Sequence, residues 1–130
     1  MRGSIVMLAL FSLTASPALA QDPVVVDSTH YSVVMGNPQV RVLRITYGPH
    51  EQSVMHWHPD AVAIFLTDAH FRFTLPDGTT RDREGKAGDV LWTPAEMHLP
   101  ENVGDAEARV ILVEMKPVKA VRVAAPAKRR

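Results

Sequence analysis

The sequence predicts an all-β domain, either a sandwich or a barrel of short strands. From Val24 onward, apolar or alternating segments repeat, and glycine, proline, asparagine or aspartate stands between them. In one segment Phe71, Phe73 and Leu75 alternate with polar residues, which is the pattern of a half-buried strand. No long amphipathic helix and no internal repeat interrupts the series.

The predicted strands follow one another with tight turns between them. Pro76-Asp77-Gly78 is the clearest turn, because proline presets its φ and glycine tolerates a positive one. Gly36-Asn37-Pro38, Gly48-Pro49 and Gly104-Asp105 separate other segments in the same way. The predicted strands cover residues 31–35, 40–47, 54–58, 62–67, 71–75, 79–83, 89–93, 98–103 and 108–115.

Residues 1–20 have the three-part layout of a secretory signal peptide, with cleavage expected after Ala20. Their apolar run is shorter than the roughly 20 residues that a membrane span needs. The alternative is a buried N-terminal helix. We expect a leader over 1–20, a barrel domain over 21–116 and a basic tail over 117–130, which is either solvated or touches a partner. The product would be periplasmic or secreted, without membrane insertion after cleavage.

The charges and the missing cysteines exclude several classes of function. The chain has 14 basic and 14 acidic side chains, and removal of the leader takes away only Arg2. This balance gives no electrostatic reason to expect nucleic acid or a membrane surface as a partner. The chain has no cysteine, so disulfides, thiolate ligands and a thiol nucleophile are excluded.

Three of the six histidines are candidate metal ligands. His56 and His58 are two apart in a predicted strand, so their side chains leave the same face. His98 opens a later segment that could lie beside them. Three neutral imidazoles leave open coordination positions, as catalytic metal sites do. The alternative is three unrelated surface histidines; His30 and His70 are expected elsewhere, with His50 and Glu51 as reserve ligands.

At these residues the sequence resembles the cupin superfamily, whose first motif is His-x-His, then a glutamate and a glycine. His56-Trp57-His58 matches the pair. Val62 occupies the glutamate position with three intervening residues, and Ala69 the glycine position. The first motif is therefore half present.

The second cupin motif is better kept, and the resemblance as a whole covers residues 40–116. It has a glycine, a proline, a histidine and an asparagine, matched here by Gly88, Pro94, His98 and Asn102. One residue is missing between the proline and the histidine, and Glu96 stands where a glycine is usual.

The resemblance implies a jelly-roll barrel, the double-stranded β-helix, with a metal inside one mouth. It implies His56, His58 and His98 as ligands of one divalent transition metal, namely Fe, Mn, Zn, Ni or Cu. Val62 cannot coordinate, although the cupin-like cysteine dioxygenases use three histidines and ferrous iron. The closing segments are similar to those of small exported cupins of unassigned activity. Pairing into a homodimer is also implied.

The segments around the histidines predict an apolar pocket for a small, partly hydrophobic ligand. Its expected lining is Val62, Ile64 and Leu66 on one strand, Val54 on the histidine strand, and Trp92 on a third, with ordinary packing as the alternative. On that third strand either Val90 and Trp92 or Leu91 must face the core. Glu96 is a candidate catalytic residue: a carboxylate behind the ligands, a general base or a solvated loop acid.

Three functions are consistent with these features. The first is a metal-dependent enzyme acting on a small molecule, an oxygenase or an isomerase. The second is a ligand-binding or sensing module, with or without metal. The third is a structural metal that stabilises the barrel. Copper trafficking, suggested by Met55 and Met97, is disfavoured because Met55 should point away from the histidines.

Overall fold

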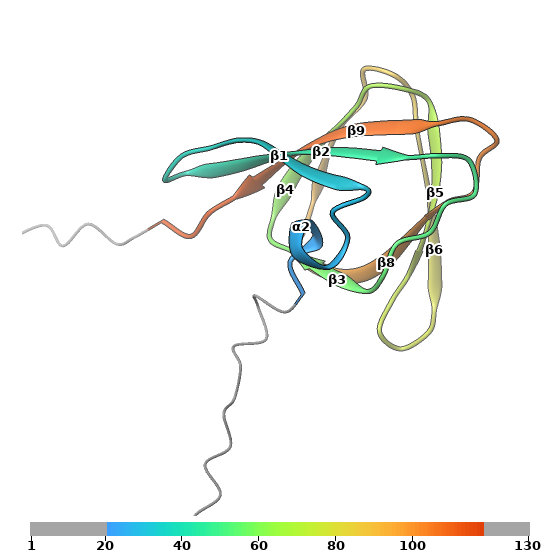
Figure 1. Ribbon diagram of the computed structural model, residues 1–130, viewed down its shortest axis with the longest axis horizontal. Helices are drawn as coiled ribbons and strands as arrows, with labels where there is room; N and C mark the ends of the chain where they lie inside the picture. The colour runs from blue at the N-terminus through green and yellow to red at the C-terminus, as the bar shows by residue number, and fades with distance from the viewer. Residues whose placement is uncertain (1–20, 119–130) are drawn as a thin grey trace, which may run out of the picture.

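The protein folds as two antiparallel β-sheets that face each other (Figure 1). The computed structural model describes residues 21–118. One sheet has the strand order β1-β2-β9-β4-β7 and the other β3-β8-β5-β6. The strands are β1 (Tyr31–Gly36), β2 (Val40–Tyr47), β3 (His56–His58), β4 (Ala61–Phe65), β5 (Ala69–Thr74), β6 (Thr80–Gly85), β7 (Val90–Thr93), β8 (Glu96–Asn102) and β9 (Ala108–Met115).

The hydrophobic core lies between the sheets and is built from alternate residues of the central strands. In β9 the burial alternates strictly from Ala108, so every second side chain faces inward. The same alternation runs along β4 and the end of β2. The buried apolar residues are Tyr31, Leu43, Ile45, Tyr47, Ala61, Ala63, Phe65, Phe71, Ala108, Val110 and Leu112.

The predicted all-β double-stranded β-helix is therefore confirmed, and every predicted strand is present. Two strands, β2 and β9, have the predicted bounds, and the others differ by a few residues at their ends. The turn at 76–78 forms as expected: the amide of Gly78, at φ +83°, donates to the carbonyl of Leu75 over 2.9 Å.

One short helix, α2 (Pro23–Val26), precedes the strands, where an extended segment was expected from Val24. Pro23 begins it, a position where the missing amide hydrogen costs nothing, and Asp22 caps it by accepting from the amide of Val24 over 3.0 Å. Figure 1 shows α2 at the open end of the barrel, next to β3.

The leader and most of the tail lie outside the described residues, so the predictions for 1–20 and 119–130 stay predictions. Within residues 21–118, none of the helical structure has the length and apolar character that a membrane crossing requires.

Candidate metal centre

Strand pairing brings the three candidate histidines together. β3 pairs with β8 so that His56 lies opposite His98, and His58 opposite Glu96. The inner faces of both strands point toward the barrel interior, where His56 and His58 are buried. One ring nitrogen from each of the three histidines lies within 4.8 Å of the others. The cluster predicted from the sequence therefore exists as one group.

Oxygen acceptors orient all three imidazoles in the same way. Nδ1 of His56 lies 2.8 Å from the carbonyl oxygen of Val54. Nδ1 of His58 lies 2.7 Å from Oε1 of Glu114, and Nδ1 of His98 lies 2.9 Å from Oε1 of Glu96. A carbonyl or an ionised carboxylate only accepts, so each Nδ1 carries the proton. Each Nε2 is left with a lone pair, the form in which histidine binds metal.

The spacing of two of these nitrogens suits a shared ion. Nε2 of His56 and Nε2 of His58 are 3.1 Å apart. Two nitrogens that each bind an ion at about 2.0–2.1 Å are about 2.8–3.4 Å apart at coordination angles between 90° and tetrahedral. Without a cation or a proton between them, two facing lone pairs at this distance would repel. The donor set therefore fits a divalent transition metal.

Burial keeps two of the ligands neutral. Loss of hydration, with the neighbouring His58 and His98, lowers the pKa of His56 to about 3. Burial also lowers the pKa of His98 to about 4, although the hydrogen bond to Glu96 opposes the change. Neutral imidazole is the metal-binding form, so the site is ready for a metal at neutral pH without giving up these protons.

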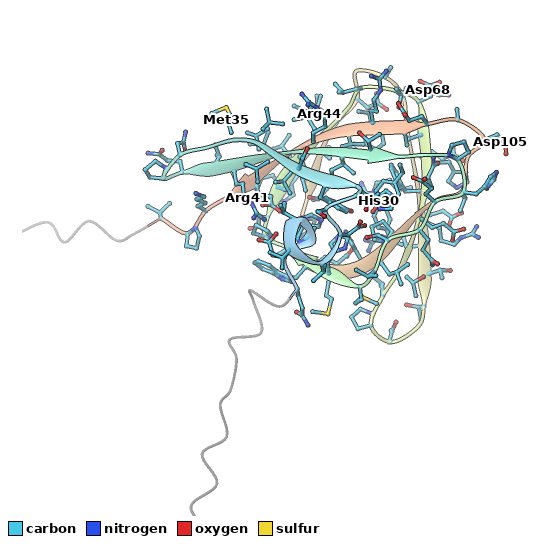
Figure 2. The ribbon with its side chains drawn as sticks, viewed as in Figure 1. His30, Met35, Arg41, Arg44, Asp68 and Asp105 are labelled. Carbon is cyan, nitrogen blue, oxygen red and sulfur yellow. The ribbon has the colours of Figure 1, made fainter. Side chains whose placement is uncertain are left out.

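A chain of charged groups behind His58 was not predicted from the sequence. Glu114 is buried in β9, and its second oxygen accepts from Nε of Arg41 over 2.6 Å. Arg41 in turn donates to Asp22 over 2.6 Å, beside α2 (Figure 2). Burial works to raise the pKa of Glu114, but the hydrogen bonds from His58 and Arg41 outweigh it and hold that pKa below its usual value. The sequence signal that could have revealed this chain is Glu114 itself, the one charged residue on the inward face of β9.

A second group of polar side chains, Ser53, Asp27 and His30, lies behind His56. The hydroxyl of Ser53 lies 3.5 Å from Nδ1 of His56 and donates to the carboxylate of Asp27. Asp27 also contacts His30, whose ring stacks on Tyr47 at a centroid distance of 4.2 Å. His30 therefore belongs to the surroundings of the site and not to the three-histidine cluster.

The other histidines lie away from the cluster, as expected for His70. His50 contacts Asp105, and His70 contacts Asp82 on the outer side of its sheet. The reserve ligands His50 and Glu51 are both exposed and are not part of the cluster.

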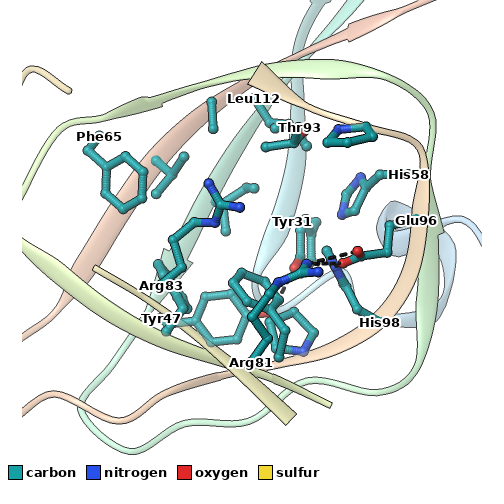
Figure 3. A pocket seen from close by; sticks show the side chains of 17 residues that line it. Tyr31, Tyr47, His58, Phe65, Arg81, Arg83, Thr93, Glu96, His98 and Leu112 are labelled. Carbon is teal, nitrogen blue, oxygen red and sulfur yellow. Dashed lines mark hydrogen bonds and ion pairs between the residues drawn. The ribbon is translucent and has the colours of Figure 1, made fainter. Parts of the chain in front are cut away.

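A pocket of about 100 Å³ adjoins the histidines (Figure 3). Most of its wall is aromatic or aliphatic, and its polar side chains include two histidines and two arginines. The lining residues are Tyr31, Ile45, Tyr47, His58, Ala63, Phe65, Phe71, Phe73, Arg81, Arg83, Thr93, Pro94, Glu96, His98, Pro100, Val110 and Leu112. An apolar cavity of about 150 Å³ holds benzene. This smaller pocket is therefore limited to a small molecule.

The predicted pocket lining is wrong for the strand β4. Ala61, Ala63 and Phe65 face the interior, so Val62 and Ile64 face the outer side of the sheet, and Leu66 is exposed just beyond the strand. Both alternate sets of β4 are apolar, so the alternation could not tell which one faces inward, and a shift of one residue exchanges the faces.

The remaining two predicted lining residues are also wrong. Trp92 pairs with Val62 across the outer face and is 56% exposed, whereas Leu91 packs against the core. Val54 precedes β3 and its side chain is 48% exposed. Its carbonyl, and not its side chain, serves the site by holding His56.

The missing glutamate of the first motif is not replaced within β4. Val62 faces outward, and the inward positions Ala61 and Ala63 have no ligand atom. Ala61 lies directly opposite Glu114 of β9 in the sheet. A carboxylate thus reaches the site from the neighbouring strand, where it holds His58.

Glu96 lines the pocket and is held on two sides. Its carboxylate accepts from Arg81 over 2.7 and 2.8 Å, and one of its oxygens accepts from Nδ1 of His98. Burial acts to raise the pKa of Glu96, but these two partners lower it below the usual value. This arrangement suits a role of Glu96 in orienting His98 better than a role as a general base.

Comparison with known proteins supports the architecture. No protein-family model matches the chain, and no curated protein matches it. A cupin domain from Bordetella pertussis Tohama I is similar in structure, with a TM-score of 0.62 and 22% identity over 67% of this chain and 92% of that one.

Two further crystal structures have the same architecture. An RmlC-like cupin family protein with a double-stranded β-helix fold from Methanocaldococcus jannaschii has a TM-score of 0.52 and 17% identity over 87% of this chain and 93% of that one. A protein with a double-stranded β-helix domain from Klebsiella pneumoniae has a TM-score of 0.53 and 20% identity over 65% of this chain and 74% of that one. Together with the two facing antiparallel sheets and the histidine cluster in the barrel, these similarities identify the chain as a protein of the cupin fold.

Proposed function

We propose that the protein binds one divalent transition metal through Nε2 of His56, His58 and His98 and acts on a small molecule in the adjoining pocket. The observation that carries this proposal is the common orientation of the three rings: every Nδ1 has an oxygen acceptor, so the free nitrogens converge. Surface histidines without a common function have no reason to share one orientation. Fe, Mn, Zn, Ni and Cu all accept such a nitrogen donor set.

The proposed activity is that of a metal-dependent oxygenase or isomerase. A bound metal would supply Lewis acidity or, if redox-active, oxygen chemistry. The chain's own residues would orient the ligands and exclude water: Glu114 and Glu96 hold two imidazoles, and the apolar wall lines the substrate side. Burial raises the pKa of both Tyr31 and Tyr47, so both hydroxyls stay protonated. They hydrogen-bond each other over 2.8 Å, which leaves one of the two protons for a substrate.

The second candidate is a ligand-binding module without catalysis. It is favoured by the state of Glu96, the pocket's carboxylate, whose lowered pKa makes it a weak base. In this case the metal and the apolar wall would bind a ligand without changing it. Turnover of any small molecule by the metal-loaded protein would exclude this candidate.

The test is the metal content of protein purified without chelator and without a nickel affinity step. We expect one equivalent per chain in the wild type and a loss of metal in His98→Ala. His70→Ala is the matched control, because His70 lies on the outer side of the same sheet and contacts Asp82. No metal in the wild type after reconstitution with each of the five metals would contradict the proposal.

The leader pattern supports a periplasmic or secreted location, and the cupin fold is compatible with a homodimer. Both are parts of the proposal. Cleavage after Ala20 would be seen by N-terminal sequencing of the exported product, and the mass in solution by light scattering would give the assembly.

A further inference from the structure

The inner face of the edge strand β6 presents two arginines to the pocket. Arg81 lies opposite Phe73 and Arg83 opposite Phe71 on the neighbouring strand β5, and all four residues line the pocket. The guanidinium of Arg81 is already engaged, because it donates to both oxygens of Glu96. Arg83 differs from it in having no such partner.

No carboxylate among residues 21–118 lies within 4.0 Å of the Arg83 guanidinium. The acidic neighbours of Arg83 in β6 face the other side of the strand. Asp82 binds Arg72 and His70, and Glu84 lies 3.7 Å from His70. Arg83 is nevertheless partly buried against an aromatic wall.

A guanidinium of this kind favours an anion in the pocket. It has five donors in a rigid planar fork and remains charged at all ordinary pH values. The nearby carboxylates cannot neutralise it, because Arg81 and His98 occupy Glu96, while Arg41 and His58 occupy Glu114. The bidentate partner that matches the fork is a carboxylate.

Arg83 and the histidines lie at opposite ends of the pocket. Arg83 lies opposite Phe71 of β5, and Phe71 lies opposite Asn102 of β8. His98 lies four residues before Asn102 on β8, which is about 13 Å along the strand at the usual rise per residue. Figure 3 shows Arg83 beside Phe65, on the side away from His58 and His98. The aromatic rings of Phe71 and Phe73 lie between, and Phe73 is 4.7 Å from the ring of His98.

We infer that the pocket takes a small organic acid, whose carboxylate binds Arg83 and whose apolar body lies along Phe71 and Phe73. The opposite end of the acid then points toward the three histidines. The orientation toward a metal rests on the proposed function, whereas the binding of the acid by Arg83 does not. Arg81 is a neighbour of this site, but its own carboxylate partner within the protein keeps it from serving as the anchor.

The test compares acids with their neutral amides of the same shape. Benzoate and benzamide, and isobutyrate and isobutyramide, are titrated by calorimetry into metal-free protein and into zinc-loaded protein. We expect each acid to bind about tenfold or more tightly than its amide, since a charge-assisted bidentate pair distinguishes them. Arg83→Gln should remove this preference and leave amide binding unchanged, while Arg83→Lys should keep part of it.

Arg72→Gln is the matched control. Arg72 lies on β5 between Phe71 and Phe73, but its side chain faces outward and binds Asp82. The control should retain the full preference for acids, and thermal melting of every variant shows that it is folded.

Three outcomes would overturn the inference: neither acid binds the wild type, acids and amides bind equally, or the preference survives Arg83→Gln. A preference seen only with zinc, and kept in Arg83→Gln, would place the carboxylate on the metal and also overturn it. A preference that depends on Arg83 in protein unable to hold any metal would support the inference while the proposed function fails.

Discussion

Nδ1 of His58 lies 2.7 Å from Oε1 of Glu114, and both side chains are buried in the barrel. The two residues come from strands β3 and β9, which belong to different sheets. A carboxylate in this position fixes the ring orientation and makes the imidazole a stronger donor. Glu114 therefore connects the five-stranded sheet to the histidine cluster.

Replacement of Glu114 should weaken metal binding without removing a ligand. Glu114→Gln keeps the shape but loses the charge that holds His58, so we expect metal affinity to fall by about 10–100-fold. Competition with a coloured chelator would measure the affinity. Glu107→Gln is the control, because Glu107 is exposed. Equal affinity in Glu114→Gln and the wild type would show that the carboxylate does not act on the site.

Acid should destabilise the metal-free protein in a window set by the buried histidines. The pKa values of His56 and His98 are lowered to about 3 and about 4 in the fold, against about 6.5 in the unfolded chain. Below about pH 6.5 the unfolded chain takes up protons that the fold excludes. The free energy of unfolding therefore falls as pH drops toward about 4, by up to about 1.4 kcal/mol per pH unit for each histidine.

Urea unfolding of metal-free protein between about pH 7.5 and pH 5 checks this slope. His98→Gln should make the slope shallower by close to one proton, whereas His70→Gln, at a partly exposed position on the outer side of the same sheet, serves as the control. A slope that is the same in all three proteins would refute this source of acid sensitivity.

Chelation should lower stability but leave the barrel folded. The buried apolar residues of β2, β4 and β9 form a core that does not depend on the histidines. A metal present at 1,000 times its dissociation constant adds about 4 kcal/mol, which chelation removes. Circular dichroism melts with and without chelator measure the change. Complete unfolding on chelation would favour the structural-metal function instead.

Gly85 should not tolerate a side chain. A Cβ at Gly85 would lie 2.7 Å from Cγ of Phe65, and closer to two other ring atoms, while Phe65 is buried and has little room to move. We expect Gly85→Ala to cost about 1–3 kcal/mol of unfolding free energy, as overpacking does. Gly36→Ala is the control, since its Cβ would meet only ordinary contacts at 3.7 Å or more. Equal urea midpoints for the two variants would contradict the packing argument.

The fold and the three histidine ligands could be predicted from the sequence, whereas the lining of the pocket could not. Strand positions could be predicted because turn residues separate the segments, and His56 and His58 could be assigned to one face because side chains alternate in a strand. His98 could be included through the second motif. The pairing of Ala61 with Glu114 could not be foreseen, since it depends on which strands become neighbours across the sheet.

The pocket prediction failed for a specific physical reason. In β4 the larger residues Val62 and Ile64 face outward and the small Ala61 and Ala63 face inward. Size would suggest the opposite, but Ala63 lines the same pocket as the rings of Tyr31 and His58, which occupy the interior. The position of Arg83 in the pocket could not be predicted, because an arginine in a polar edge strand has the sequence pattern of a solvated residue.

The place of Glu114 in the last strand also bears on when the site matures. β9 inserts between β2 and β4, so the carboxylate behind His58 arrives only after the end of the domain has been synthesised and docked. A nascent chain that ends before β9 has all three histidines but lacks the group that orients one of them. The full set of groups that orients the histidines is therefore a property of the completed barrel, present only once its last strand has docked.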